Sequence, residues 1–437
     1  MRYEPRNLVA SAGIFSPAGW NDGDPDGYVS WEATKMQTSP FRALTHYRVL
    51  PRIAGWKALI VAFAARAPYA MIPLGTITAV SASTGSIAEG GFATAAVALS
   101  TAIVGPLIGK WADSSGQDIP LKILTPINAL ALLGLFFSAH SGLSGLPLYL
   151  VCMLVGVTSI PIGSFMRSRW IAQTSIPREL NAALSYESMA DELVFVLGPA
   201  LVGMAASAAA PSAPLGLAFV LVATAGVLFA LDAPKSTKAD RESKTEGPHV
   251  FAVLRSVAPT IITMMAIGTY FGAAQTAVTA RAEIAGVPTT AGLVYAAMGL
   301  GSAVMAILTV TIPERISLPT RLLVGGAGMS IVMALTIPMP NLWLTAMTLT
   351  ACGLFIGPSM VTAFSITEAL APKRGIAIAM TSMQSAVTIG VSLGAGVNGW
   401  ISQNYGDTPA FATTALAASV VAAVGLGLTL RSRNENR

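Results

Sequence analysis

The stretch AGWKALIVAFAARAPYAMIPLGTITAV, residues 54–80, determines the fold class. It carries two charged side chains, Lys57 near its start and Arg66 in its middle, and is otherwise mostly apolar. A helix needs about 20 such residues to cross the hydrocarbon core of a bilayer, whereas a membrane-spanning strand needs only about 9–11. The length therefore predicts a transmembrane α-helix, which satisfies its backbone polar groups internally.

Eleven further apolar stretches of similar length follow along the chain. They lie near residues 88–109, 119–139, 145–165, 184–207, 213–232, 252–279, 289–311, 320–338, 342–366, 375–400 and 409–430. Together with the first stretch they predict an all-α membrane protein with twelve transmembrane helices, embedded in the lipid bilayer.

The composition argues against several other classes of protein. Of the 437 residues, 53% are hydrophobic and only 11% charged, against roughly 25% charged residues in soluble domains. The basic residues are scattered, so we do not expect nucleic acid as a partner. Cys152 and Cys352 lie singly in apolar stretches, and the sequence contains no P-loop. We therefore expect no disulfide, no metal site and no cofactor.

The distribution of Lys and Arg predicts the orientation of the chain. Of its 26 basic residues, all but two fall on one side if both termini are cytoplasmic. The exceptions are Arg281, on the other side, and Arg66, inside the first span. Basic residues accumulate in cytoplasmic loops, so this bias predicts an even number of spans in the plasma (inner) membrane.

The hydrophilic stretches divide the chain into five parts. We expect a disordered cytoplasmic extension at 1–50, a bundle of six helices at 51–232, a cytoplasmic linker at 233–250, a second six-helix bundle at 251–430 and a tail at 431–437. Met36 is an alternative start for translation. The segment starting at Pro177 has the same layout as the one starting at Pro372, which is typical of parallel repeats in transporters.

Two short motifs carry a resemblance to the major facilitator superfamily. The loop GKWADSSGQ, residues 109–117, is similar to the Gly-xxx-Asp-xx-Gly signature of that family at Gly109, Asp113 and Gly116. It departs from the usual pattern at Ser114 and Gln117, where the family places basic residues. The loop therefore lacks the basic partners that the family's charge relay uses.

The second motif lies in the predicted fifth span. The sequence LGPALVG resembles the Gly-Pro-xx-Gly motif of proton-coupled drug and solute antiporters, at Gly198, Pro199 and Gly203. The resemblance implies two six-helix bundles that give alternating access to a central site. Small residues and Pro also serve plain helix packing, so that interpretation stays open.

Asp113 is expected to face the positive N-terminal end of a neighbouring helix, a contact worth about 0.3–1 kcal/mol. The resemblance implies that this neighbour is the eleventh helix, which begins near Gly375. The alternative is a solvated loop charge with no such partner.

Arg66 is the most informative charge, because it is expected near the middle of the bilayer. A charge at that depth costs about 2.5–3.5 kcal/mol, so it needs a partner or an aqueous cavity. The acidic residues expected at that depth are Asp191 and Glu192, with Glu187 one turn closer to the cytoplasm. Glu187 and Asp191 are four residues apart and share a helix face, whereas Glu192 projects about 100° away.

We therefore hypothesise that Arg66 and the pair Asp191/Glu192 form a polar site for proton coupling or for a polar group of the solute. The alternative is an ion pair that only fixes helix packing.

Six further polar residues are candidates for lining a cavity, or for plain hydrogen bonds between helices. They are Tyr69, Ser164, Tyr270, Gln275, Ser359 and Gln384. Arg167 and Arg169 are interpreted as topological anchors at the end of the fourth span, with a possible salt bridge from Arg169 to Glu187.

These features favour a secondary transporter that exports a small solute in exchange for protons and acts as a monomer. Uptake of a sugar, an amino acid or an organic anion is the alternative. A scaffold or sensor that does not transport is a further candidate from another class. An enzyme is not expected, because the three histidines lie outside the spans or at a span end and offer no catalytic group.

Overall fold

The computed structural model describes residues 44–234, 248–287, 290–313 and 315–435. Within them, twelve helices are long and apolar enough to cross a membrane, which confirms the number predicted from the sequence. The observed spans overlap all twelve predicted stretches. The fifth differs most at its start, because it begins at Pro177 and so extends the predicted 184–207 by two turns.

The first six spans contain nine helical elements, because the fourth and sixth spans are each interrupted. They are α4 (Trp56–Thr84), α5 (Ile87–Ser115), α6 (Asp118–His140), α7 (Leu146–Val157), α8 (Ile162–Gln173), α9 (Pro177–Ala208), α10 (Ala213–Leu221), the π-helical turn η2 (Val222–Gly226) and α11 (Val227–Leu231).

The last six spans are preceded by a short helix, α13 (Val250–Ser256). They are α14 (Ala258–Ile284), α15 (Ala291–Leu308) with η4 (Thr309–Thr311), α16 (Leu318–Thr336), α17 (Leu342–Leu370), η5 (Lys373–Gly375) with α18 (Ile376–Tyr405), and α19 (Asp407–Glu435).

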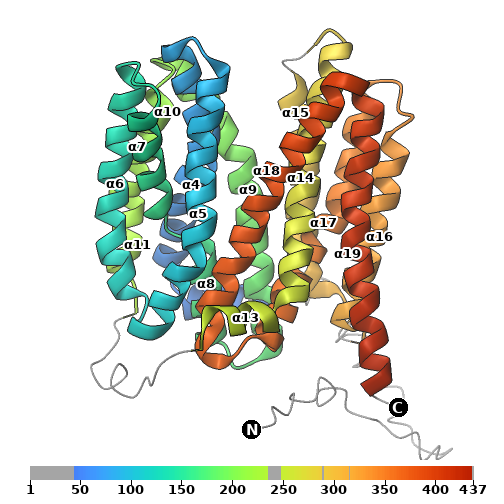
Figure 1. The fold of residues 1–437 in the computed structure, drawn as a ribbon. Coiled ribbons are helices and arrows are strands. Elements are labelled where there is room, and N and C mark those ends of the chain that lie inside the picture. The colour runs from blue at the N-terminus through green and yellow to red at the C-terminus, as the bar shows by residue number, and fades with distance from the viewer. Residues whose placement is uncertain (1–43, 235–247, 288–289, 314, 436–437) are drawn as a thin grey trace, which may run out of the picture.

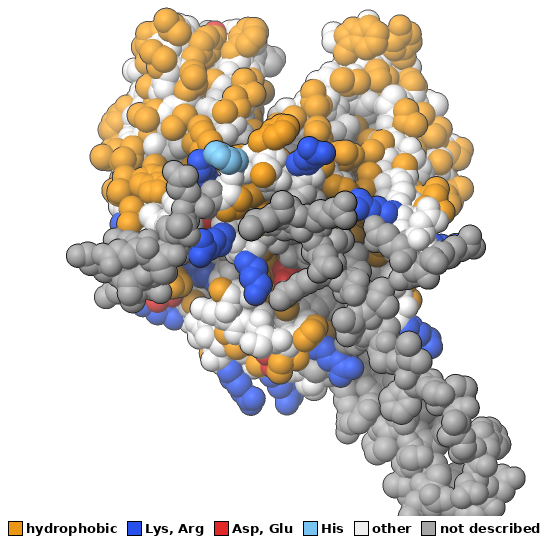
Figure 2. All heavy atoms as spheres, turned by 60° about the horizontal axis from the view of Figure 1, so that its bottom comes forward, with side chains coloured by type: hydrophobic (Ala, Val, Ile, Leu, Met, Phe, Trp, Pro, Cys, Tyr) orange, Lys and Arg blue, Asp and Glu red, His pale blue; other side chains and the backbone are white. Residues whose placement is uncertain are grey.

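The helices form two groups that meet at one end and separate at the other (Figure 1). We call the end where α13 lies the linker end. Helices α5 and α9 of the first group contact α18 and α15 of the second. In the space-filling view, the two groups are separate lobes at the far end, and many Lys and Arg side chains lie on the linker end (Figure 2).

Small residues let the helices of each group pack closely. At Gly390 of α18, an added Cβ would lie 2.8 Å from the backbone nitrogen of Thr269 in α14, so no larger residue fits without a shift. Approaches of this kind are typical of membrane helices, which associate by van der Waals packing of small residues.

The expected extension and linker lie mostly outside the described residues, and Met36 lies wholly outside them. Where the extension is described, the prediction of disorder is wrong. Leu44–Val49 form the 3₁₀ helix η1 and Leu50–Ile53 form α3. The Tyr47 hydroxyl donates to the carbonyl of Ile307 in α15 at 2.6 Å. Burial raises the pKa of Tyr47, so its hydroxyl stays protonated and able to donate.

The C-terminal tail also differs from the prediction, because α19 continues to Glu435 and is not interrupted at residue 430.

The fourth span is broken, which the sequence prediction missed. Helix α7 ends at Val157, α8 begins at Ile162, and Thr158–Pro161 lie between them. Asn128 of α6 is fully buried and donates to the Val155 carbonyl at 3.0 Å and to the Thr158 hydroxyl at 2.9 Å. The break is therefore held by protein contacts, which backbone without helical hydrogen bonds requires at this depth.

Candidate functional site

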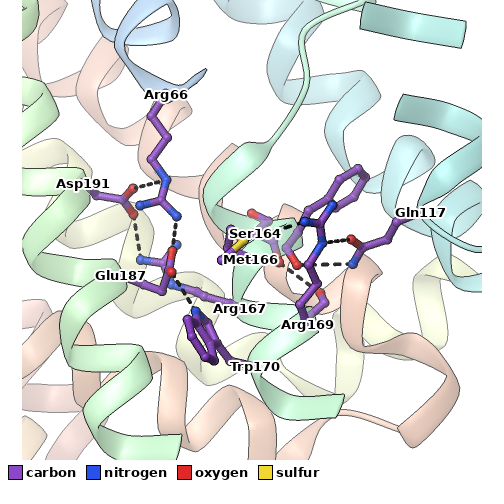
Figure 3. Close-up of polar contacts among 11 residues, drawn as sticks. Arg66, Gln117, Ser164, Met166, Arg167, Arg169, Trp170, Glu187 and Asp191 are labelled. Carbon is purple, nitrogen blue, oxygen red and sulfur yellow. Dashed lines mark hydrogen bonds and ion pairs between the residues drawn. The ribbon is translucent and has the colours of Figure 1, made fainter. Parts of the chain in front are cut away.

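A cluster of buried charges joins α4, α8 and α9 within the first group of helices (Figure 3). The Arg66 Nη2 donates to Oε2 of Glu187, and Trp170 Nε1 donates to the other oxygen, Oε1, at 2.7 Å. Glu187 is fully buried and both of its oxygens are bound, so it is held as a fixed counter-ion. Trp170 also lines a cavity of about 210 Å³.

Asp191 lies between two arginines. Its Oδ2 accepts a hydrogen bond from Arg167 Nη2 at 2.7 Å, and its Oδ1 lies 3.6 Å from Arg66 Nε. The Asp191 side chain keeps 13% of its surface exposed, whereas Glu187 keeps none. Asp191 is therefore the less tightly bound of the two carboxylates.

Glu192 does not join this cluster, so the proposed grouping of Arg66 with an Asp191/Glu192 pair needs correction. The next residue along a helix points about 100° away, and Glu192 turns toward Ser302 and Tyr295 of α15 in the other group. Its side chain is 3% exposed, and Oε1 has no hydrogen-bond partner among the described residues. It is a buried carboxyl group at the boundary between the two groups.

The two arginines interpreted as anchors are both buried, and they have different partners. Arg167 is fully buried and pairs with Asp191, which the sequence interpretation missed. Arg169 does not bridge Glu187. Its Nε donates to Oε1 of Gln117 at 2.9 Å, and its guanidinium lies 4.2 Å from the centre of the Phe229 ring. Gln117 thus engages an arginine from the position where the family motif places a basic residue.

Arg167 and Ser164 also contact the second group of helices. The guanidinium carbon of Arg167 lies 3.7 Å from the centre of the Phe364 ring in α17. The Ser164 hydroxyl donates to the carbonyl of Met380 in α18 at 3.0 Å. We call the charged group formed by Arg66, Arg167, Glu187 and Asp191 the ion cluster. Through Arg167, the ion cluster of the first group therefore touches the second group directly.

Asp113 caps the helix that the family resemblance pointed to. Its two carboxylate oxygens accept hydrogen bonds from the backbone N–H groups of Ala377 and Ile378, at 3.0 and 2.9 Å. Gly109 lies one turn earlier on α5, where an added Cβ would be 2.7 Å from the Ala377 carbonyl oxygen. Asp113 and Gly109 thus hold α5 against the start of α18 at the linker end. Gly116, with φ of 89°, ends α5 in a conformation that suits glycine.

The two glycines of the Gly-Pro motif in α9, Gly198 and Gly203, differ in how closely they pack against other helices. An added Cβ at Gly198 would lie 2.8 Å from the Ala70 Cβ of α4, one turn from Arg66. At Gly203 it would meet no atom within 4 Å. Pro199 lies within the helix and is exposed. Only Gly198 is needed for close packing of α9 against α4.

The six polar candidates do not form one cluster. The Tyr69 hydroxyl lies 3.4 Å from Oδ1 of Asn128, and Ser359 bonds to the carbonyl of Phe355 in its own helix. Tyr270 is fully buried and its hydroxyl has no hydrogen-bond partner among the described residues. Gln275 is exposed and Gln384 is partly buried. Of the six, Tyr69 and Ser164 lie nearest in sequence to the ion cluster, each three residues from one of its arginines, Arg66 and Arg167.

Comparison with known proteins assigns the family. Residues 58–332 match the family model described as the Major Facilitator Superfamily. The chain belongs to that superfamily. A comparison with curated proteins found no match to the chain. The chain is therefore an integral membrane protein of a family whose fold serves secondary transport of small molecules, rather than an enzyme fold.

Solved transporter structures share this fold at low sequence identity. A bacterial homologue of the iron transporter ferroportin, in an outward-facing state with soaked iron, has a TM-score of 0.67 at 14% identity, over 85% of this chain and 98% of its own. The human organic anion transporter MFSD10 gives 0.62 at 14% identity, over 88% and 99%. The transporter FucP, in the outward conformation, gives 0.62 at 13% identity, over 87% and 98%.

The ion cluster offers no obvious metal site. Among the described residues, no group of three or more His, Cys, Asp or Glu side chains is placed to hold a metal ion.

Proposed function

We propose that this member of the superfamily is a proton-coupled secondary transporter, and that Asp191 carries the coupling. The supporting observation is its position between Arg66 and Arg167, with part of its surface exposed. A carboxylate held by two cations is ionised, and losing either contact favours its protonated form. Movement of Arg167 or entry of a solute would therefore change the protonation of Asp191.

Glu192 is the second residue proposed to carry protons. It is buried at the boundary with α15 and forms no ion pair with a described basic residue. A buried carboxyl group without a cation favours its neutral form. Separation of α9 from α15 would expose it to water, where it would release the proton.

We propose that the linker end faces the cytoplasm of a plasma (inner) membrane and that both termini lie there. The Lys and Arg side chains on that end support this orientation (Figure 2). In this orientation the conformation is closed to the cytoplasm, and transport requires the contacts of Asp113, Ser164 and Arg167 with the second group to break. One chain supplies both sides of that interface, which supports a monomer.

Export by exchange for protons is the first candidate direction. It is supported by the Gly198-Pro199 segment, which resembles that of antiporters and packs against α4 close to Arg66. Uptake of an organic anion together with a proton is the second candidate. It is favoured by unpartnered nitrogens on Arg66 and Arg167. The two candidates differ in whether solute and proton exclude each other or bind together.

The test is solute-dependent proton movement into proteoliposomes that contain a pH-sensitive dye. A panel of organic cations, sugars, amino acids and organic anions is added in turn, with protein-free liposomes as the blank. We expect one class of solute to move protons with wild-type protein, and Asp191→Asn and Glu192→Gln to reduce that movement strongly while the protein stays folded.

The direction of proton movement separates the two candidates. Protons that move with the solute indicate uptake by co-transport, and protons that move against it indicate exchange. Full proton movement in both variants would remove these residues from the coupling. A wild-type protein that moves no solute of the panel, in either direction, would favour a scaffold or sensor.

A further inference from the structure

Four nitrogens of two buried arginines have no hydrogen-bond acceptor in the part of the chain that the structure describes. They are Nε and Nη1 of Arg66 and Nε and Nη1 of Arg167. Arg66 is 5% exposed and Arg167 is fully buried. Buried guanidinium nitrogens normally find acceptors, so unpartnered ones indicate a place where an acceptor binds.

These nitrogens gather around one point at the start of α8. A Cβ added at Gly163 would lie 3.1 Å from Arg167 Nη1 and 3.1 Å from Asp191 Oδ1. The same Asp191 oxygen lies 3.6 Å from Arg66 Nε. The guanidinium groups of Arg66 and Arg167 therefore flank the Asp191 carboxylate (Figure 3). The bare backbone of Gly163 lies beside the same carboxylate.

The break in the fourth span adds a second source of positive potential. The first N–H groups of a helix have no partner within it, and its N-terminus carries a partial positive charge. Gly163 lies in the first turn of α8, a helix of 12 residues that begins inside the span. In secondary transporters, half-helices of this kind point their N-termini at anionic groups of the substrate.

We propose that Arg66, Arg167 and the first turn of α8 at Gly163 bind an oxyanion group of the transported solute, a carboxylate or a phosphate, in the place that the Asp191 carboxylate now holds. This proposal rests on the proposed transport function and names its class of substrate. Once Asp191 is displaced, Nη2 of Arg167 joins the unpartnered Nη1 of the same guanidinium, and this fork can bind a planar oxyanion through two parallel hydrogen bonds. Arg66 can add single hydrogen bonds from Nε and Nη1.

Charge balance links the anion to a proton. The cluster now holds two cations, Arg66 and Arg167, and two anions, Glu187 and Asp191. An added anion would leave one excess negative charge in a buried site, unless a proton joins the displaced carboxylate. The proton adds to an oxygen of Asp191, and the net charge of the cluster is unchanged. Anion and proton then bind together, as in the second candidate direction.

The groups around Asp191 define the pH dependence. They are Arg66 on α4, Arg167 on α8, Glu187 and Glu192 on α9 itself, and Tyr295 on α15, which faces Glu192. Since the arginines stay charged and Glu187 is fixed by Arg66 and Trp170, we expect Asp191 to take the proton. Anions should therefore bind more tightly at pH 5.5 than at pH 7.5.

The test is calorimetric titration of the full chain in lipid nanodiscs with benzoate, succinate and inorganic phosphate. Benzamide serves as the uncharged counterpart of benzoate. We expect at least one of the three anions to bind and benzamide not to bind. Arg167→Lys and Gly163→Ala should each weaken that anion roughly tenfold or more, the first by removing the fork and the second by filling the site. Gly163→Ala leaves every charged group in place.

Arg169→Lys is the matched control. Arg169 lies on the same helix and is 7% exposed, but it bonds to Gln117 outside the cluster. Its substitution should change the anion affinity by less than about twofold. Equal weakening by Arg169→Lys, equal binding of benzamide, or no binding of any of the three anions would overturn the proposal.

The outcomes also separate this proposal from the proposed function. If no anion binds while a cation or sugar moves protons, the proposed function stands and the anion site is wrong. If an anion binds through Arg167 but moves no protons, the site stands and the proton coupling is wrong.

Discussion

Helices α9 and α18 occupy corresponding positions in the two halves of the chain and differ in their charge. Counted from Pro177 and Pro372, Glu187 of α9 corresponds to Ser382 of α18, and Asp191 corresponds to Ala386. Both helices pack across the boundary between the groups. At these two positions the same scaffold thus carries carboxylates in one half and small uncharged residues in the other.

The second half likewise has a buried core that is mostly apolar. Its buried core contains many methionines, among them Met264, Met329, Met360 and Met383. Its described ion pair, between Arg281 and Asp407, lies at the end of the bundle opposite the linker. The comparison indicates that the first half holds the charged chemistry, and that the second half supplies an apolar surface, such as Phe364, against which it works.

The largest expected effect on stability comes from removing Arg66, one of the two buried arginines of the ion cluster in the first half. Arg66→Ala leaves Glu187 and Asp191 with one arginine in place of two, and removing one partner of a buried ion pair costs about 3–5 kcal/mol. Thermal unfolding of the purified protein should show a large fall in its midpoint. Lys110→Ala, on an exposed residue of α5, is the control and should leave the midpoint nearly unchanged. A loss below about 1 kcal/mol for Arg66→Ala would mean that water already stabilises both carboxylates.

A second substitution tests the contact between the halves. Gly109→Val places atoms where a Cβ is already 2.7 Å from the Ala377 carbonyl oxygen, and overpacking of this kind costs about 1–3 kcal/mol. The cost applies only when the linker end is closed, so the variant should favour separation of α5 from α18.

Spin labels at Ser114 and Lys373, both exposed, would report the change in a background without Cys152 and Cys352. We expect a longer distance in Gly109→Val than in wild type. Gly203→Val is the control, because no atom lies within 4 Å of its Cβ position. An unchanged distance in Gly109→Val would contradict the assignment of this contact to the closed state.

Arg281, the buried arginine of the ion pair in the second half, should affect stability without affecting coupling. Arg281 donates to Asp407 at 2.5 Å, to the Thr336 carbonyl at 2.8 Å and to the Thr345 hydroxyl at 3.0 Å. Arg281→Ala should cost about 1–3 kcal/mol by leaving acceptors unpaired. The Arg281→Ala variant should move as many protons per folded molecule as the wild-type protein does. Loss of coupling here would break the division of roles between the halves.

The smallest expected effects are two changes in stability of opposite sign, at the two glycines of the Gly-Pro motif in α9. Gly203→Ala should stabilise the protein by about 0.5–1 kcal/mol, because Ala favours helix and meets no neighbour there. Gly198→Ala should instead destabilise it, because its Cβ would lie 2.8 Å from that of Ala70. Parallel thermal unfolding of the two variants gives the comparison. Stabilisation by both would show that α4 and α9 can separate freely at Gly198.

The number of spans was predictable because hydropathy and length directly reflect the thickness of the bilayer. The separation of Glu192 from Asp191 was also readable, since neighbouring helical residues point about 100° apart. Their grouping into one site with Arg66 ignored that rule.

The break in the fourth span and the role of Arg167 could not be read from hydropathy. A broken helix and a continuous one have the same apolar content, and the predicted span stopped at residue 165. Pro161, after the polar pair Thr158 and Ser159, was the available signal. Once the span continues to Gln173, Arg167 lies inside it and needs a partner.

The most direct test of the central claim compares one carboxylate from each half. In proteoliposomes, Asp191→Asn and Asp407→Asn are assayed with the solute that moves most protons in wild type, for accumulation driven by a pH gradient and for solute exchange without a gradient. We predict that Asp191→Asn loses driven accumulation but retains exchange, and that Asp407→Asn retains both. Driven accumulation that persists in Asp191→Asn, or fails equally in Asp407→Asn, would contradict the assignment of the coupling to the charged half.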